Sequence, residues 1–197
     1  MAIHNVPPET GPGTRAAARE VLAAIDLAPE GFTRPDTFAE EIELIFEVQR
    51  AVLTIAPEDV GIPRGQSRNL RALIDAGHGL CYDRSRAMET ILSLYGFETR
   101  HVAVYGMDES EPDWRTWITP GGPSHAVSEV LTRQGWLLLD SNEPWLGLTA
   151  DGRVIGVRDL QRHPDLAWDS RVRASLSPIF ESRFRYIYGL YSRHGEF

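Results

Sequence analysis

Cys81 is the only cysteine of the 197-residue chain, and the stretch around it constrains the fold more than any other. Gly77 and Gly79 give the backbone freedom just before it. Small or apolar residues then recur at helical spacing, at positions 81, 85, 88, 92 and 95. Gly96 is of the residue type that commonly ends a helix. The pattern predicts a buried helix that begins at Cys81.

A cysteine in the first turn of a helix is well placed for nucleophilic chemistry. The unpaired N–H groups and the partial positive charge of a helix N-terminus favour the thiolate, which is the nucleophilic form. The same N–H groups can hold the oxyanion of an acyl-transfer intermediate. The alternative is that Cys81 is merely a small buried hydrophobic residue. Which of these two roles Cys81 has depends on the residues that lie near it in the fold.

The composition is that of an ordinary soluble globular protein, with 42% hydrophobic and 24% charged residues. No run of about 18 apolar residues predicts a membrane span. The first residues lack the pattern of a secretory signal, and one cysteine cannot form an internal disulfide, so we expect a cytoplasmic protein. The net charge of −8, without a basic cluster, argues against nucleic acids or anionic membranes as partners.

The start of the chain predicts an arm followed by one domain. Residues 1–13 are rich in proline and glycine, which is typical of a flexible arm, and residues 14–197 are expected to form a single domain. Within this domain, Thr14 is the expected cap of a first helix that ends at Pro29.

Two more helices are expected before the cysteine. Thr37 and Glu40 have the spacing of a capping box, and an apolar stripe follows as far as Pro57. A short helix is then predicted with Ser67 as its cap and Gly77 at its end. This helix delivers the chain to the cysteine.

A β-hairpin is predicted after the cysteine helix. Residues 125–131 and 136–140 have the character of strands, and Gln134-Gly135 is typical of the turn between them. In an antiparallel pair, the start of the first strand lies beside the end of the second. The hairpin therefore brings His125 near Asp140.

The remaining segments give weaker signals. Residues 97–105 are predicted to form a strand before the hairpin. After it, Asp151-Gly152 indicates a turn, residues 154–157 a short strand and residues 157–162 a helical turn. Residues 179–191 fit either a helix or a strand, and we favour the helix.

Cys81, His125 and Asp140 together have the chemistry of a cysteine acyl-transfer site. A thiol nucleophile needs an imidazole within reach, and a carboxylate then fixes the tautomer of that imidazole. Each residue also has an ordinary structural interpretation. A histidine on a strand is often a hydrogen-bonded core residue, and Asp140 before Ser141-Asn142 can simply begin a turn.

Other side chains compete for roles in the site. His101 and His78 are alternative bases, ranked below His125. A metal site through His78, His101 and His163 has no recognised ligand spacing to support it. Gln66 is a candidate donor to the oxyanion, although Asn69 or a backbone N–H can serve the same purpose.

Tryptophans are concentrated just upstream of His125. Residues 106–122 are predicted to form an aromatic loop, and we expect its Trp114 and Trp117 to bind substrate as a wall or lid of the acyl site. The alternative is that they only anchor the loop. Trp136, on a predicted strand, is expected to belong to the core.

Four pieces of the chain, in this order, carry a family resemblance. They are Gly79–Ser85 around the cysteine, Gly96–Val102, His125–Val130 and Gly135–Asp140. The chain resembles the transglutaminase-like superfamily of papain-like cysteine enzymes over about residues 65–145. Two positions depart from the family pattern: Val127 replaces a usual aromatic residue, and Ser141 replaces a frequent proline.

The resemblance implies both a fold and an activity. The expected fold is α+β, a papain/transglutaminase-like core with N-terminal helices packed on a small antiparallel sheet. The implied catalytic residues are Cys81, His125 and Asp140, which act without a cofactor on a peptide or protein through a thioester. We expect a peptidase or amidase. An acyltransferase, a specialised peptide-processing enzyme and an inactive binding module are the alternatives.

Overall fold

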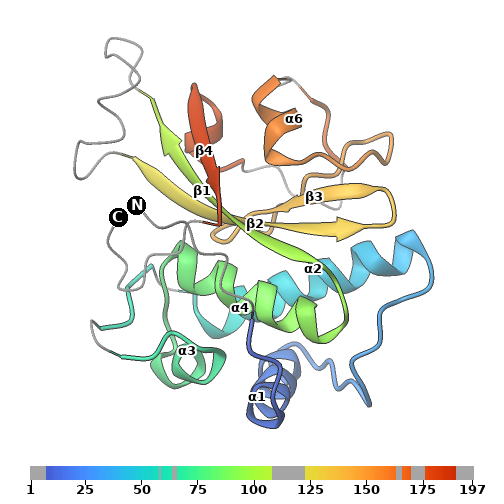
Figure 1. Ribbon diagram of the computed structural model, residues 1–197, viewed down its shortest axis with the longest axis vertical. Coiled ribbons are helices and arrows are strands. Elements are labelled where there is room, and N and C mark those ends of the chain that lie inside the picture. Colours follow the sequence, from blue (N-terminus) through green and yellow to red (C-terminus); the bar gives the residue numbers. More distant parts are fainter. Residues whose placement is uncertain are drawn as a thin grey trace.

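The computed structural model describes residues 8–57, 59–63, 66–107, 123–162, 166–169 and 176–189. Among these residues, four strands form one antiparallel sheet in the order β3-β2-β1-β4 (Figure 1). The strands are β1 Thr99–Gly106, β2 Ser124–Thr132, β3 Gly135–Leu139 and β4 Phe184–Tyr188. The helices are α1 Pro12–Ala23, α2 Phe38–Ile55, α3 Leu70–Ala76, α4 Cys81–Leu94, α6 Val157–Arg162 and the 3-10 turn η1 Pro178–Phe180.

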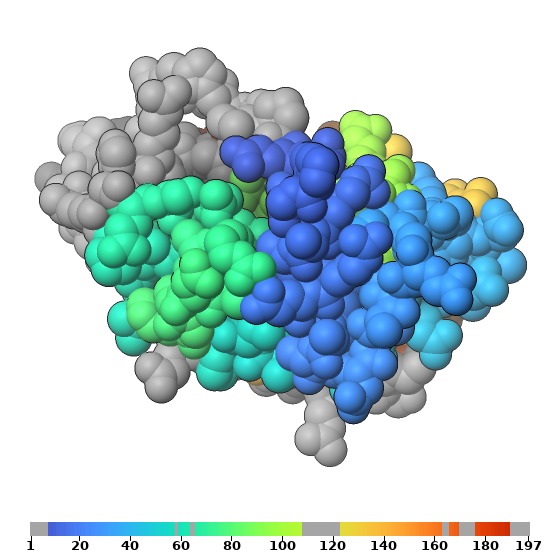
Figure 2. All heavy atoms as spheres, turned by 90° about the horizontal axis from the view of Figure 1, so that it is seen from below, coloured from blue at the N-terminus to red at the C-terminus, as the bar shows by residue number. Residues whose placement is uncertain are grey.

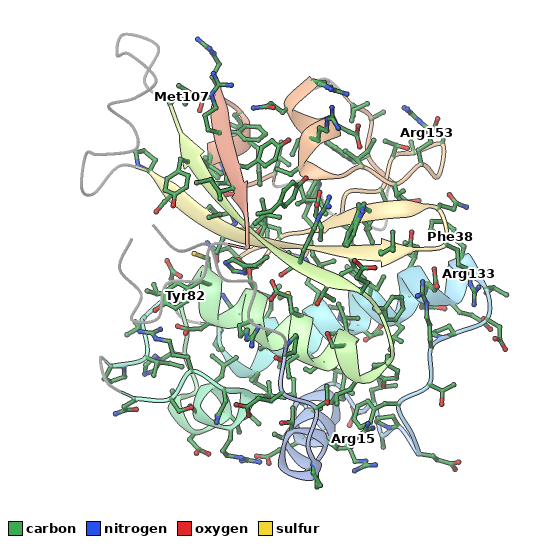
Figure 3. The ribbon with its side chains drawn as sticks, in the orientation of Figure 1. Arg15, Phe38, Tyr82, Met107, Arg133 and Arg153 are labelled. Carbon is green, nitrogen blue, oxygen red and sulfur yellow. The ribbon has the colours of Figure 1, made fainter. Side chains whose placement is uncertain are left out.

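Helices α1 to α4 lie on one side of the sheet, and α6 lies on the other (Figure 1). Figure 2 shows the helical side, where the blue-to-green N-terminal half of the chain forms most of the visible described surface. Side chains fill the space between these helices and the sheet (Figure 3). The predicted α+β class is therefore confirmed. Within the described part of the chain, no helix is both long and apolar enough to span a bilayer.

Helix α4 begins at Cys81, as predicted, and local contacts explain why. The side chain of Asp83 accepts a hydrogen bond from the backbone N–H of Leu80 (3.1 Å), which satisfies a donor at the helix start. Arg68 forms an ion pair with the same carboxylate at 2.8 Å. The rest of α4 is buried against β2, β1 and α2. The packing fixes where the first turn of the helix meets the sheet.

Helix α2 confirms the predicted capping box and adds an unpredicted feature. The Thr37 hydroxyl accepts from the N–H of Glu40, and the Glu40 carboxylate accepts from the N–H of Thr37. The buried face of α2 is not purely apolar, because Glu41 and Gln49 are both fully buried on it. Such groups need polar partners inside the protein.

Two predicted caps are wrong: Thr14 does not cap the first helix, and Ser67 does not cap the third. Helix α1 starts at Pro12 with Gly11 as its N-cap, so it includes the last two residues of the predicted arm. Proline is favoured at the first helical position because its missing N–H would be unpaired there anyway. Helix α3 is capped by Asn69, whose side chain accepts from the N–H of Ala72 (3.0 Å), whereas Ser67 accepts from the N–H of Asn69. Residues 1–7 lie outside the described residues.

The helix favoured for residues 179–191 is wrong over its described part. This part contains the short turn η1 and the strand β4, which pairs with the edge of β1 in a register that places Val104 opposite Tyr186. A free strand edge offers unpaired backbone groups, and this segment satisfies them. Since the partner strand is about 80 residues away in the sequence, local periodicity does not reveal the pairing.

Two smaller expectations also need correction. Residues 154–157 do not form a strand: Val154 makes one isolated bridge with Leu148, and α6 begins at Val157. Trp136 is only partly buried, because it lies on the sheet face opposite α4, where the guanidinium of Arg100 stacks 3.8 Å from its ring centroid. The predicted turn at Asp151-Gly152 is present.

Gly77 is predicted to be a specific conformational requirement of the connection to Cys81. It ends α3 at φ 66°, where a side chain costs roughly 1–2 kcal/mol, partly offset by the lower entropy of the unfolded chain. We expect Gly77→Ala to lower the free energy of unfolding by about 1 kcal/mol in urea denaturation. Gly13→Ala is the matched control, because an added Cβ meets no atom within 4 Å at either site. Equal effects of the two substitutions would contradict this account.

Candidate active site

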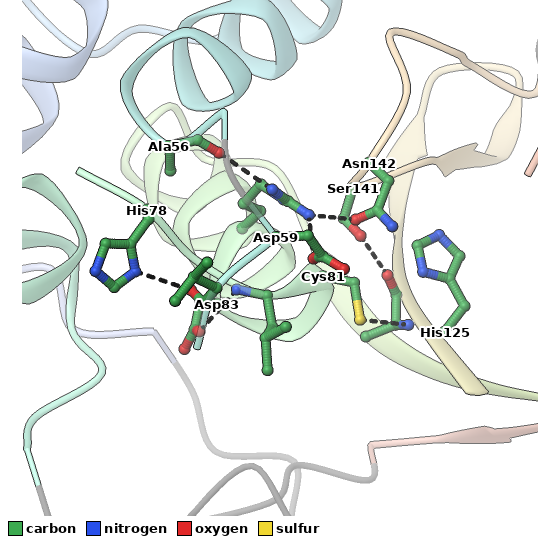
Figure 4. Close-up of polar contacts among 12 residues, drawn as sticks. Ala56, Asp59, His78, Cys81, Asp83, His125, Ser141 and Asn142 are labelled. Carbon is green, nitrogen blue, oxygen red and sulfur yellow. Dashed lines mark hydrogen bonds and ion pairs between the residues drawn. The ribbon is translucent and has the colours of Figure 1, made fainter. Parts of the chain in front are cut away.

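Cys81 lies at the junction between α4 and the sheet. Its side chain is partly exposed, and its sulfur accepts a hydrogen bond from the backbone N–H of Ala126 on β2 at 3.4 Å (Figure 4). The alternative of a cysteine sealed in apolar packing is therefore wrong. Cys81 is partly exposed, a backbone N–H contacts its sulfur, and the residue stands at the N-terminus of α4.

His125 and Asp140 meet in the buried space beside the cysteine. The predicted hairpin is present, with Ser128 opposite Leu139, and it brings His125 Nε2 to 3.0 Å from Asp140 Oδ1. The imidazole is only 5% exposed, and its side chain also interacts with Cys81. Because Nε2 contacts the carboxylate, Nδ1 is the nitrogen left for the thiol.

The electrostatics of His125 favour a protonated ring. Burial disfavours the charged form and by itself would lower the pKa of His125. The hydrogen bond and charge of Asp140, together with the interaction with Cys81, outweigh this and raise the pKa to about 10. An imidazolium held beside a sulfur stabilises the thiolate. Phe180 of η1 packs edge-on against the ring, with centroids 6.3 Å apart.

Asp140 has both of the roles that were predicted for it as alternatives, since it contacts the imidazole and also begins a turn. Its Oδ1 accepts from His125 and also from the backbone N–H groups of Asn142 (2.8 Å) and Glu143 (3.3 Å). The carboxylate therefore caps a turn and orients an imidazole at once. Its Oδ2 is buried without a hydrogen-bond partner in the described part of the chain. The described hydrogen bonds of this carboxylate are thus all made by Oδ1, which the ring of His125 shares with the turn.

Gln49 is a residue of the site's surroundings that the sequence analysis missed. It is fully buried on α2, and its Nε2 lies 2.8 Å from the carbonyl oxygens of both Asp140 and Trp145. It therefore anchors the loop that carries the carboxylate. A signal was available, since an amide interrupts the apolar stripe of α2 between Ile45 and Val52.

Two serines fix the strand position next to His125. Ser85 on α4 and Ser141 after β3 both donate from their hydroxyl groups to the carbonyl oxygen of Ala126, at 3.1 and 2.5 Å. The N–H of the same residue contacts the cysteine sulfur. Ser141, which departs from the family pattern, thus has a structural role. No sequence signal distinguishes these serines from others in the chain.

The competing histidines do not lie at the cysteine. His101 is fully buried, and its Nδ1 contacts the carboxylate of Glu89 at 3.0 Å. His78 is 2.9 Å from the carbonyl oxygen of Val60. His163 falls outside the described residues. Within the described ranges, no group of three histidine, cysteine or acidic residues is arranged to hold a metal ion.

The predicted substrate-binding residues remain untested. Trp114 and Trp117 lie outside the described residues. Gln66 is exposed, and its backbone N–H donates to the carbonyl of Pro63 (3.3 Å). No described contact joins Gln66 to the cysteine. Val127 is fully buried in the hydrophobic core.

A partly exposed thiol, an imidazole and a carboxylate thus converge on an α+β core, an arrangement typical of cysteine acyl-transfer enzymes. The family model of the transglutaminase-like superfamily matches residues 36–141, which is 106 of 197 residues and includes all three groups. The chain belongs to this superfamily, whose members are generally cysteine-dependent enzymes of acyl transfer or hydrolysis. The match also covers α2, which the sequence resemblance had not reached.

One solved structure that the chain matches is the periplasmic domain of TgpA from Pseudomonas aeruginosa. The sequence identity is 20% and the TM-score is 0.43; the alignment covers 71% of this chain and 45% of the other. The chain thus spans less than half the length of that domain. No curated protein matches the sequence.

We predict that the ring of His125 titrates near pH 10, which NMR of the ring nitrogens measures. Asp140→Asn and Cys81→Ser should each lower this pKa, because each removes a group that favours the imidazolium. In the double variant only burial remains, so the pKa should fall below about 6.5. The resonance of His125 is identified by its absence from the spectrum of His125→Gln.

The same shift has a consequence for stability. Because the pKa is raised on folding, the protonated ring of His125 stabilises the fold fully below about pH 6.5, and this contribution disappears as the pH rises to about 10. A wild-type ring that titrates at about 6.5 would contradict the ion-pair description.

Proposed function

We propose that this protein is a cysteine-dependent hydrolase that cleaves an amide bond in a peptide or protein substrate. The observation that carries the proposal is the contact of His125 with both Asp140 and Cys81 at the N-terminus of α4. Membership of the transglutaminase-like superfamily supports the same class of reaction. Cys81 acts as the nucleophile, His125 as the base, and the carboxylate of Asp140 orients the imidazole.

In the first half of the reaction, His125 holds the proton of the Cys81 thiol and the thiolate attacks the carbonyl carbon. The oxyanion that forms is stabilised by N–H groups at the start of α4. The C–N bond then breaks, His125 gives its proton to the leaving amine, and the acyl group remains on the sulfur as a thioester.

In the second half, His125 takes a proton from water as the water attacks the thioester carbon. The C–S bond breaks, a carboxylic acid leaves, and the proton taken from water stays on His125 beside the thiolate, which restores the starting pair. Asp140 keeps the ring in one orientation and stabilises its charged form throughout both halves. Its bonds to the turn at Asn142 hold it in place.

Water is proposed as the acceptor because Cys81 is not sealed from solvent. Cys81 is partly exposed, and water at about 55 M competes with any amine that the protein does not bind specifically. A crosslinking enzyme needs walls that exclude water. Val127, where the family usually has an aromatic residue, is buried in the core and contributes no such wall.

The alternatives differ from this proposal at defined points. An acyltransferase would share the thioester and differ only in the acceptor. A specialised peptide-processing enzyme would share the reaction and act on one partner. An inactive binding module would not need the hydrogen-bonded His125–Asp140 pair beside a partly exposed thiol. The cytoplasmic location expected from the sequence stays a prediction.

The nucleophile is tested by its rate of alkylation with iodoacetamide. We expect wild-type Cys81 to react about tenfold or more faster than the denatured chain near pH 7, because the imidazolium stabilises the thiolate. Since Cys81 is the only cysteine, replacing it abolishes labelling whatever its role. The informative variants are His125→Gln and Asp140→Asn, which should bring the rate towards the denatured value. A folded wild type that reacts like the denatured chain would refute the proposal.

The acceptor is tested by mass spectrometry of the products. We expect a glutamine- or peptide-based acyl donor, supplied with a labelled primary amine at millimolar concentration, to yield mainly the free acid, because water outnumbers the amine by roughly 10⁴. His125→Gln is the control for background hydrolysis. Predominant incorporation of the amine would favour the acyltransferase and leave the catalytic residues unchanged.

A further inference from the structure

Arg84 is a buried cation one helical turn after Cys81 on α4. Its side chain is only 3% exposed, and its guanidinium binds three different segments. One amino group donates to the carbonyl of Ala56 at 3.1 Å. The other donates to Asp59 Oδ1 at 2.8 Å and to Asn142 Oδ1 at 2.5 Å. Arg84 therefore joins the nucleophile's helix to the loop that follows β3.

The contact between Arg84 and Asn142 is connected to the carboxylate of Asp140. The backbone N–H of Asn142 donates to Asp140 Oδ1 at 2.8 Å, and the same oxygen is 3.0 Å from His125 Nε2. A continuous path of contacts thus starts on α4, passes through the guanidinium, the turn and the carboxylate, and returns to Cys81 through the imidazole. A group on such a path can control the orientation of the ring without touching a substrate.

We propose that Arg84 is a positioning residue that holds Asp140 in line with His125 by fixing the side chain of Asn142. The proposal rests on the proposed function, since it concerns the same three groups. The planar guanidinium is suited to this role because its donors point in fixed directions and can bridge several acceptors. Arg84 itself is too buried to contact a substrate.

Asp59 separates the electrostatic effect of Arg84 from its geometric effect. Its carboxylate is 62% exposed and forms an ion pair with the guanidinium, but it does not belong to the path through the turn. Asn142 is neutral and belongs to that path. If positioning is the role of Arg84, loss of Asn142 should reproduce the loss of Arg84, and loss of the Asp59 charge should not.

The readout is the pH profile of Cys81 alkylation by iodoacetate, which needs no knowledge of the substrate. The reagent is an anion, so the imidazolium of His125 attracts it, and the rate falls when the ring loses its proton. Among the described residues, the titratable groups that act on this ring are Asp140 and Cys81, and Phe180 covers it from η1. The descending part of the profile in wild type is expected near pH 10.

In Arg84→Met and in Asn142→Ala we expect this descending part to move to lower pH by about one unit, because a misaligned carboxylate stabilises the imidazolium less. The double variant should match the single ones. Asp59→Asn should stay within about 0.3 units of wild type, because exposed charges are screened. Loss of the Arg84 charge alone would move the profile of Arg84→Met to higher pH, since a nearby cation disfavours the imidazolium. The direction therefore identifies the mechanism.

Several results would overturn the proposal. One is a descending part of the pH profile that stays in place or moves to higher pH in Asn142→Ala or in folded Arg84→Met. Another is a shift to lower pH in Asp59→Asn that equals the shift in these variants. If Arg84→Met does not fold, as circular dichroism would show, Asn142→Ala decides alone. A wild-type thiol that reacts like the denatured chain would overturn the proposed function together with this inference, whereas a normal wild-type profile with unmoved variants overturns only this inference.

Discussion

The contact of α4 with β2 is the interaction on which the rest of the site depends. Ser85 donates to the carbonyl of Ala126, whose own N–H reaches the sulfur of Cys81. One short stretch of β2 therefore fixes the helix start and carries His125 in the adjacent position. Since helices and strands are stiff, a docking point this close to Cys81 and His125 holds the two side chains in a defined relative position.

Several buried polar groups near this contact have partners that tie two elements together. Glu89 on α4 accepts from Ser128 on β2 at 2.7 Å and contacts His101 on β1 at 3.0 Å. Gln49 anchors the loop after β3. Burying such groups is costly unless they are hydrogen-bonded, so they specify one arrangement of helix and sheet rather than merely stabilising it.

Much of the site was predictable because its components have local signals. The glycines before Cys81, the helical spacing after it and the turn at Gln134-Gly135 depend on residues close together in the sequence. The hairpin then brought His125 and Asp140 together without further information. The polar supports were not predictable in this way. Gln49 and the Asp140 loop are about 90 residues apart, and only the packed fold makes them neighbours.

Local signals in the sequence predict the order and type of most elements, the start of α4 and the side chains that meet at the candidate site, because periodicity, capping and turn preferences act over a few residues. The tertiary structure decided that the segment containing Phe184 becomes a strand, that Trp136 stacks against Arg100 on the far face, and that Arg84 reaches Asn142. These outcomes depend on free strand edges and buried charges, which exist only once distant segments have packed together.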